Sequence, residues 1–188
     1  NYDLTLARYN SDGTLDTGFG TGGKVTTNTT TGYESITSLV LQADGKLVAA
    51  GYSDNDLLLV RYNSDGSLDT SLGGTGKVVT SLGTGVDGAY GLALQSDGKF
   101  VLAGRTHNGS NYDVAVVRYN SNGTLDSSFG GGDGIVTTAI GSGADEGLGI
   151  AIQSDGKIIV SGKTWNGTDN DIALLRYNTD GTLDSRFD

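Results

Sequence analysis

Residues 8–16 have the sequence RYNSDGTLD, and this stretch returns as RYNSDGSLD at 61–69, RYNSNGTLD at 118–126 and RYNTDGTLD at 176–184. A second motif, Asp-Gly-Lys, begins at residues 44, 97 and 155, so both series step by 53 to 58 residues. Self-similarity at such a period is typical of repeat folds, including propellers. The chain is therefore expected to consist of one repeated unit.

Each unit contains four segments that are expected to be strands. In the second complete unit the first two strands, at 92–94 and 100–103, flank the Asp97-Gly98 dipeptide. Asp-Gly between apolar runs predicts a hairpin with a type I′ turn, in which both central residues have positive φ. The apolar residues are consecutive and not alternating, which predicts burial on both faces of these strands. A third strand is expected at 114–119, and a fourth ends at 136–138 after a glycine-rich bend.

Four-stranded antiparallel units of roughly 50 residues with doubly buried inner strands are typical of β-propeller blades. The sequence thus predicts an all-β fold of antiparallel four-stranded β-propeller blades in a partial ring. Residues 1–32 are expected to form the third and fourth strands of a first blade, and 33–85 and 86–143 two complete blades. Residues 144–188 are expected to form the first three strands and the start of the fourth strand of a last blade.

The composition excludes several classes of function. The chain has no cysteine, so it has no disulfide, thiolate nucleophile or Cys-ligated zinc. Its net charge of −10 repels phosphate backbones, which argues against a nucleic-acid partner. No apolar run approaches the roughly 20 residues of a membrane span. An acidic, cysteine-free β protein is typical of bacterial extracellular modules, so an extracellular or cell-surface location is expected. Because the chain has no initiator methionine and begins within the repeat, we expect an internal segment or a processed product.

The opening motif has two interpretations. Asn10, Asp12 and Asp16 are spaced like the oxygen ligands of a calcium loop, but the further acidic positions and the late glutamate of such loops are missing. In the third copy the aspartate becomes Asn122 while Gly123 stays, which keeps turn geometry and discards a charge. A structural hairpin turn is therefore favoured over a calcium site, and no cofactor is expected.

Two further sets of repeated polar residues are expected to be structural. The motif arginines should pair with a carboxylate that the hairpin brings back, or with an adjacent blade, because a guanidinium binds carboxylates well. The glutamines that end the first strands are expected to satisfy backbone groups. The arginines are Arg8, Arg61, Arg118 and Arg176, their expected partners are Asp16, Asp69, Asp126 and Asp184, and the glutamines are Gln42, Gln95 and Gln153.

The combined pattern DxxLxRYNxDGTLDxxFGxxGxVxT and LxLQxDGKxVxAG resembles the delta-60 repeat, a β-propeller family of large bacterial surface and secreted proteins. The resemblance covers essentially the whole chain. The main departure is Leu72, which stands where the other copies have Phe19, Phe129 and Phe187. The resemblance implies a propeller in an exported protein and supplies no catalytic residues.

A site is expected where the copies differ, because shared positions build the blades. The loop after the second strand is short at 52–55 and longer at 105–112 and 163–170, and its aromatic rings among amide groups are typical of a sugar or peptide site. In the competing interpretation the Asn-Gly pairs of these loops are type I′ turns, with the neighbouring ring packed across the hairpin. The candidate ligand-binding residues are Tyr52, His107, Asn108, Tyr112, Trp165, Asn166 and Asp169.

The sequence favours a non-enzymatic module, for adhesion, recognition or scaffolding, since His107 has no serine or cysteine nucleophile nearby and no carboxylate pair can be assigned. The alternative is a glycan-active enzyme with Asp169 or Asp171 near Trp165. The expected partners are the remainder of the parent propeller or a second copy that closes the ring, and a glycan or surface protein. Uncovered ends would present apolar patches like those of Leu92, Val101 and Val116, and edge strands at 2–9 and 174–177.

Overall fold

The computed structural model describes residues 3–29 and 32–187, and these residues form strands and turns without any helix. None of the described residues forms a helix that could cross a membrane. The strands are β1 (Leu4–Ala7), β2 (Lys24–Thr27), β3 (Glu34–Leu41), β4 (Leu47–Ser53), β5 (Asp56–Tyr62), β6 (Lys77–Thr80), β7 (Gly88–Leu94), β8 (Phe100–His107), β9 (Tyr112–Tyr119), β10 (Ile135–Thr138), β11 (Asp145–Ile152), β12 (Ile158–Trp165) and β13 (Asn170–Tyr177).

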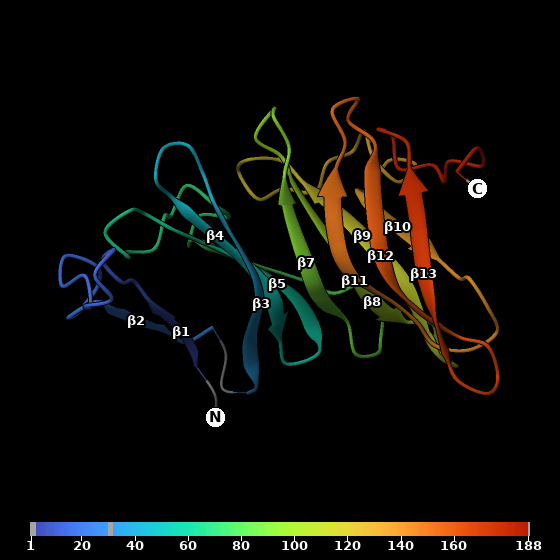
Figure 1. Cartoon of the computed structure of the whole chain (residues 1–188), viewed down its shortest axis with the longest axis horizontal. Coiled ribbons are helices and arrows are strands. Elements are labelled where there is room, and N and C mark those ends of the chain that lie inside the picture. The colour runs from blue at the N-terminus through green and yellow to red at the C-terminus, as the bar shows by residue number, and fades with distance from the viewer. Residues whose placement is uncertain (1–2, 30–31, 188) are drawn as a thin grey trace.

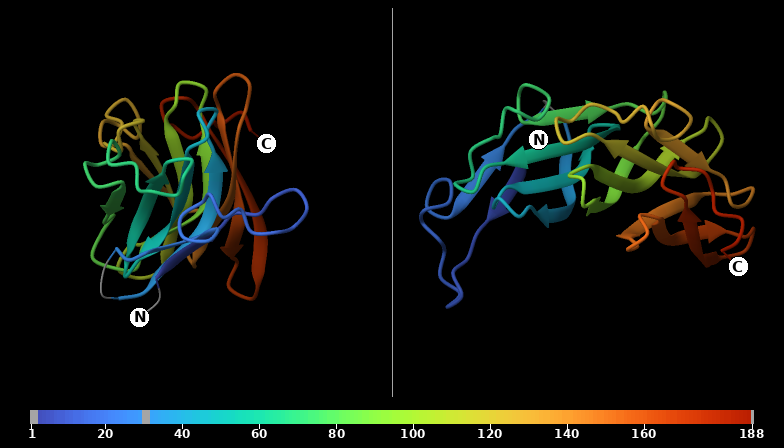
Figure 2. Two further views of the ribbon diagram at one scale, coloured as in Figure 1. Left: turned by 90° about the vertical axis from the view of Figure 1, so that its left-hand side faces the viewer. Right: turned by 90° about the horizontal axis from the view of Figure 1, so that it is seen from above.

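The strands form four antiparallel sheets that follow one another along the chain. The first sheet is β1-β2, the second β3-β4-β5-β6, the third β7-β8-β9-β10 and the fourth β11-β12-β13. The sheets stand side by side from the N-terminal to the C-terminal end (Figure 1), and seen from above they follow a curved row (Figure 2). The all-β prediction of propeller blades in a partial ring is confirmed.

The last sheet has three strands in the described part of the chain. After β13 the chain makes an isolated bridge between Tyr177 and Leu183 and continues to Phe187 without a further strand. The start of a fourth strand, expected before the end of 144–188, is therefore absent up to Phe187. Asp188 lies outside the described residues, as does Tyr2 of the edge strand expected at 2–9.

The hydrophobic core lies between neighbouring sheets. Leu59 of β5 and Leu102 of β8 belong to one buried cluster, and Val116 of β9 and Val160 of β12 belong to the next. Strand β8 is buried from Phe100 to Gly104 without alternation, as its consecutive apolar residues predict.

The predicted type I′ hairpin turns are wrong. The Gly98 amide donates to the Gln95 carbonyl (2.9 Å), and Gly98 has φ +83°, but Asp97 has no positive φ, because Asp54 is the only described non-glycine residue that has one. The turn is therefore a type I turn followed by a left-handed glycine, a geometry that three-residue hairpin loops also favour. The Asp or Asn side chain stabilises it as an acceptor: Asp97 accepts from the Lys99 amide at 3.2 Å.

The strands bring two different sets of loops to opposite ends of the sheets. The end with the RYNxDG hairpins and the Asp-Gly-Lys turns is called the motif end. The opposite end, called the rim, carries the loop between the second and third strands of each sheet and the segment that enters its first strand. In Figure 1 the motif end of the second, third and fourth sheets lies toward the top and their rim at the bottom.

Candidate functional site

At the motif end, each arginine pairs with the aspartate eight residues later, as predicted. Arg118 Nε lies 2.7 Å from Asp126 Oδ2, and Arg118 Nη1 also donates to the Thr179 carbonyl of the next sheet (2.6 Å). Lys99 Nζ adds a second cation at 2.9 Å from the same carboxylate. The equivalent arginine–aspartate pairs are Arg8–Asp16, Arg61–Asp69 and Arg176–Asp184.

These contacts lower the pKa of Asp69, Asp126 and Asp184. Burial alone would raise the pKa of Asp126, but hydrogen bonds from Lys99 and Ser128 and the charge of Arg118 outweigh it and leave the pKa well below its usual value. At Asp184 the hydrogen bond from Lys157 is the largest contribution and lowers the pKa to about 2. The arrangement is a structural ion-pair network in which every charge has a partner.

Of the side chains considered as calcium ligands, Asp12 closes the hairpin turn, while Asp16 accepts from Arg8. Asp12 Oδ1 accepts from the Thr14 amide (2.9 Å) and from Thr14 Oγ1 (2.6 Å). Asn122 Oδ1 makes the same two bonds with Thr124, at 3.0 and 2.8 Å. A neutral amide thus serves as well as a carboxylate. Within residues 3–29 and 32–187, no group of three or more His, Cys, Asp or Glu side chains is arranged to hold a metal ion.

The expectation for the repeated glutamines is wrong. The side-chain Oε1 atoms of Gln42, Gln95 and Gln153 are buried and accept no hydrogen bond from the described residues. The backbone amide of Gln95, not its side chain, closes the turn by donating to the Lys99 carbonyl (2.9 Å).

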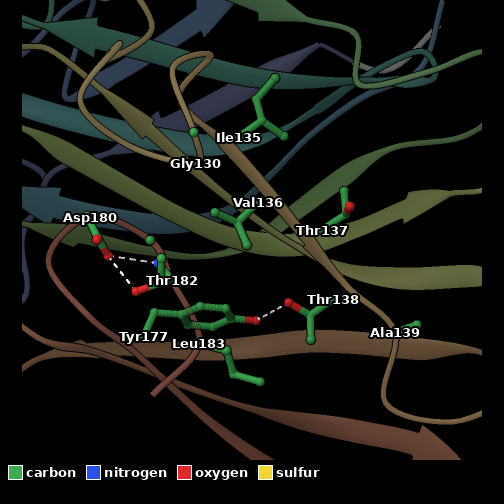
Figure 3. Close-up of a pocket in the computed structure, with 12 residues that line it drawn as sticks. Gly130, Ile135, Val136, Thr137, Thr138, Ala139, Tyr177, Asp180, Thr182 and Leu183 are labelled. Carbon is green, nitrogen blue, oxygen red and sulfur yellow. Dashed lines mark hydrogen bonds between the residues drawn. The ribbon is translucent and has the colours of Figure 1, made fainter. Parts of the chain in front are cut away.

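A hollow of about 660 Å³ lies between β10 and the last motif hairpin (Figure 3). There Tyr177 donates its hydroxyl hydrogen bond to Thr138 (2.8 Å), and burial raises the Tyr177 pKa to about 12, so the phenol stays neutral. A similar hollow of about 600 Å³ lies between β2 and the second motif hairpin, lined by Gly20 and Gly66. Because the hollow recurs between successive sheets, it belongs to the packing of the repeat and is a weak candidate for a specific site.

The rim contains a smaller cavity, whose lining differs from that of the equivalent rim hollow between the first and second sheets. It measures about 300 Å³, within the lower range of ligand sites, and lies where the second and third sheets meet. Tyr52 and Tyr90 flank Gly88, whose Cβ position would lie 3.9 Å from Tyr52 Cδ1 and 3.7 Å from the Tyr90 hydroxyl oxygen. The remaining lining residues are Asp54, Val86, Asp87 and Arg105.

Arg105 connects the cavity to two more elements. Its guanidinium carbon lies 4.0 Å from the centroid of the Tyr112 ring and 5.7 Å from that of Tyr90. Its Nη1 donates to Glu146 Oε1 of the fourth sheet at 2.6 Å, and Lys163 Nζ lies 3.4 Å from Glu146 Oε2. Arg105 Nε is buried and donates to no described residue. The aromatic faces and charges of three sheets therefore converge on one place.

Tyr90 reaches this place through a β-bulge. The register between β7 and β8 shifts between Ala89 and Gly91, so Tyr90 is the extra residue, and bulges redirect side chains in this way. Burial raises the pKa of Tyr90 even though Arg105 opposes the shift. Its hydroxyl is therefore neutral near pH 7 and able both to donate and to accept.

The predicted site residues separate into two groups. Tyr52 lines the cavity, Tyr112 lies under Arg105, and His107 packs against Tyr112 in a T-shaped pair with ring centroids 5.1 Å apart. Asn108 closes its own loop by accepting from the amides of Ser110 and Asn111, and its neighbour Gly109 alone takes positive φ, so the loop is not a type I′ turn.

The other group lies in the corresponding loop of the fourth sheet and does not line the cavity. Trp165 packs over Gly143, whose Cβ position would lie only 2.5 Å from Trp165 Cδ1. Asn166 donates to Asp169 at 2.7 Å and to Asp171 at 2.9 Å, so these side chains are joined in one turn.

Tyr90, Arg105, Glu146 and Lys163 were not predicted. One feature of the sequence points to two of them: the residue after the glycine of the second strand is Tyr52, Arg105 or Lys163, and so differs in every copy. Pairing across the sheet then places Glu146 opposite Lys163 and Gly88 opposite Arg105.

Comparison with known families agrees with this architecture. The model of a β-propeller domain of unknown function, DUF5122, matches residues 1–19, 42–72, 95–129 and 153–187, one segment for each motif copy. No curated protein matches the chain. The matched segments cover well over half of the sequence and confirm the resemblance to the delta-60 repeat. The chain belongs to the DUF5122 β-propeller family.

Proposed function

We propose that this β-propeller is a non-enzymatic recognition module that binds a neutral glycan in the rim cavity. The observation that carries the proposal is the cavity between Tyr52 and Tyr90, with Arg105 beside it. Tyrosine rings offer flat apolar faces to sugar rings, and their hydroxyls together with Asp54 and Arg105 offer donors and acceptors to sugar hydroxyls.

The charges around the cavity favour a neutral ligand over an anionic one. Glu146 lies 2.6 Å from Arg105 and 3.4 Å from Lys163, and Asp54 and Asp87 also line the cavity, so three carboxylates accompany these two cations. The net charge of −10 further opposes polyanions. A row of sheets that presents such a cavity suits adhesion or recognition by an extracellular or cell-surface protein, and the acidic, cysteine-free composition supports that location.

A glycan array probed with the chain, followed by calorimetry with the best neutral oligosaccharide, tests the proposal. Tyr52→Ala and Arg105→Ala should each weaken binding by about tenfold, the loss expected when one stacking or polar contact worth ~1.4 kcal/mol is removed. Trp165→Ala is the matched control, because Trp165 belongs to the equivalent loop but does not line the cavity, and it should bind like the wild type. Undiminished binding by both cavity variants, or turnover of the bound glycan, would overturn the proposal.

A further inference from the structure

Three asparagines of the chain are followed directly by glycine. Asparagine is a chemically labile residue, because the backbone nitrogen of the next residue can attack its side-chain carbonyl carbon. A glycine in the next position leaves that nitrogen without a shielding side chain. The three pairs are Asn108-Gly109 and Asn166-Gly167 in the rim loops of the third and fourth sheets, and Asn122-Gly123 in a hairpin of the motif end.

The two rim loops hold their asparagines in the same way. Asn108 Oδ1 accepts from the amides of Ser110 (2.9 Å) and Asn111 (3.0 Å), and Asn166 Oδ1 makes the equivalent two bonds at 2.8 and 3.0 Å. Both asparagines are exposed to water. Two amide donors at a carbonyl oxygen stabilise the negative charge that develops there during nucleophilic attack. Both side chains are therefore polarised toward attack to a similar degree.

The two loops differ in the group that faces the attacking nitrogen. The Gly109 amide donates to His107 Nδ1 at 3.2 Å, which is within the reach of a general base. In the fourth sheet Trp165 takes the place of His107 as the last residue of the second strand. The indole ring has one N–H donor and no acceptor, so Trp165 cannot take the proton of the Gly167 amide.

The pair at the motif end is protected by its turn. The Gly123 amide donates to the Asn120 carbonyl at 2.9 Å, so its proton faces a backbone acceptor and not a base. Gly123 is buried, and its Cβ position would lie 3.0 Å from Leu72 Cδ1 of the second sheet. Attack on Asn122 would therefore require the turn to open and to lose its packing against the second sheet.

We propose that Asn108 is a site of spontaneous deamidation, with His107 as the catalytic base. His107 Nδ1 takes the proton of the Gly109 amide, the nitrogen forms a bond to Asn108 Cγ, and Oδ1 receives the electron pair of the carbonyl. The Cγ–Nδ2 bond then breaks, and Nδ2 leaves as ammonia with the proton that His107 returns. Water opens the resulting succinimide at one of its two carbonyls, so the products are ammonia and an aspartate or isoaspartate at this position.

The product would alter the rim loop between β8 and β9. In the intact loop Asn108 Nδ2 donates to Asn111 Oδ1 (2.6 Å) and to Asp113 Oδ2 (3.0 Å). Deamidation replaces this donor by a carboxylate, which repels Asp113. The same loop leads to Tyr112, whose ring centroid lies 4.0 Å from the Arg105 guanidinium carbon, so the change reaches the edge of the rim cavity. The inference does not depend on any ligand bound there.

Mass spectrometry of the ageing wild-type chain measures all three sites in one sample. Cleavage after lysine and arginine places Asn108, Asn166 and Asn122 in the separate peptides 106–118, 164–176 and 119–157. Deamidation makes a peptide heavier by one mass unit, and a sample taken at the start corrects for changes during digestion. Asn108 should react fastest and Asn122 slowest. Asn108 should exceed Asn166 by at least about tenfold, a modest part of the roughly 10²–10⁴-fold that a positioned base contributes.

Exchange of the two rim rings separates the base from the loop that carries it. His107→Trp should slow Asn108 by at least about tenfold, and Trp165→His should accelerate Asn166 by a similar factor. Each ring packs over a glycine of the preceding loop, so each site accommodates the other ring. Asn122 reports on the fold in the same samples, because opening of its turn would accelerate it.

The proposal requires both exchanges to act in opposite directions while Asn122 stays slow. Equal rates at Asn108 and Asn166 in the wild type would overturn it. So would an unchanged rate at Asn108 in His107→Trp, or an unchanged rate at Asn166 in Trp165→His, because the histidine would then not act as the base.

Discussion

The two ends of each sheet are built from different kinds of contact, although the same strands connect them. At the motif end all four copies use the same arginine–aspartate pair, of which Arg118–Asp126 is one example. At the rim the equivalent positions are Tyr52, Arg105 and Lys163, each with different neighbours. The comparison indicates that the motif end holds neighbouring sheets together, while the side chains of the rim can differ from copy to copy and so form a binding site.

Acid should weaken the motif end first, and this is the largest expected effect because it acts on three of the four copies at once. An aspartate whose pKa is lower in the folded than in the unfolded chain stabilises the fold above the unfolded pKa of about 4 and loses this contribution as the pH falls through the folded pKa. The pKa is lowered at Asp69, Asp126 and Asp184, to about 2 at Asp184.

Urea denaturation should therefore show constant stability from about pH 7 to 5 and a steep loss between about pH 4 and 2. In Asp126→Asn one of these carboxyls is absent, so the stability at pH 7 should be lower and the loss below pH 4 smaller. Equal acid slopes in the wild type and the variant would contradict the role of Asp126.

Replacing a single arginine by alanine should lower the free energy of unfolding more when its ion pair is buried than when it is exposed. The side chains of Arg118 and Asp126 are 6% and 7% exposed, whereas those of Arg8 and Asp16 are 37% and 31% exposed. Arg118→Ala leaves a buried carboxylate with less compensation and should cost about 3–5 kcal/mol of unfolding free energy. Arg8→Ala should cost about 1 kcal/mol or less. Similar losses in the two variants, measured by urea denaturation, would show that burial does not set the strength of these pairs.

Replacing glycines of the motif hairpin by alanine should also lower the free energy of unfolding more at a buried position than at an open one, but by a smaller margin. Gly13→Ala meets only the left-handed backbone, at a cost of about 1–2 kcal/mol. Gly123→Ala meets the same backbone cost, and its Cβ would also lie 3.0 Å from Leu72 Cδ1 and 2.8 Å from Val78 Cγ2. Overpacking should add about 1–3 kcal/mol. Equal losses would show that the contact between the second and third sheets at Gly123 relaxes around the new methyl group.

The difference between the ends also explains what the sequence could predict. The strands and the arginine–aspartate pairs follow from local patterns that recur, such as the eight-residue spacing of Arg61 and Asp69 across a hairpin. The turn type could not be decided from the Asp-Gly dipeptide, because a type I turn followed by glycine accepts the same residues as type I′. The rim cavity combines Tyr52, Tyr90 and Arg105 from two sheets, and Tyr90 depends on a bulge that no short pattern announces.

The smallest effect is expected from removal of divalent cations, and it tests whether the motif end is held by hydrogen bonds or by metal. Asp12 and Asn122 make equivalent pairs of hydrogen bonds to a following threonine, although only one of them is charged. A chelator should therefore leave the melting temperature within about 1 °C of its starting value. A cation present at 100 times its Kd would instead contribute about 2.7 kcal/mol, and its removal would lower the melting temperature of a chain of this size by roughly 5–10 °C. Asp12→Asn should likewise leave the melting temperature nearly unchanged, because asparagine retains the accepting oxygen. The contrary result is a melting temperature that falls by several degrees on chelation in the wild type but not in Asp12→Asn. It would place a cation at the first hairpin. The aspartates of the motif would then be explained by their charge and not by the turn geometry.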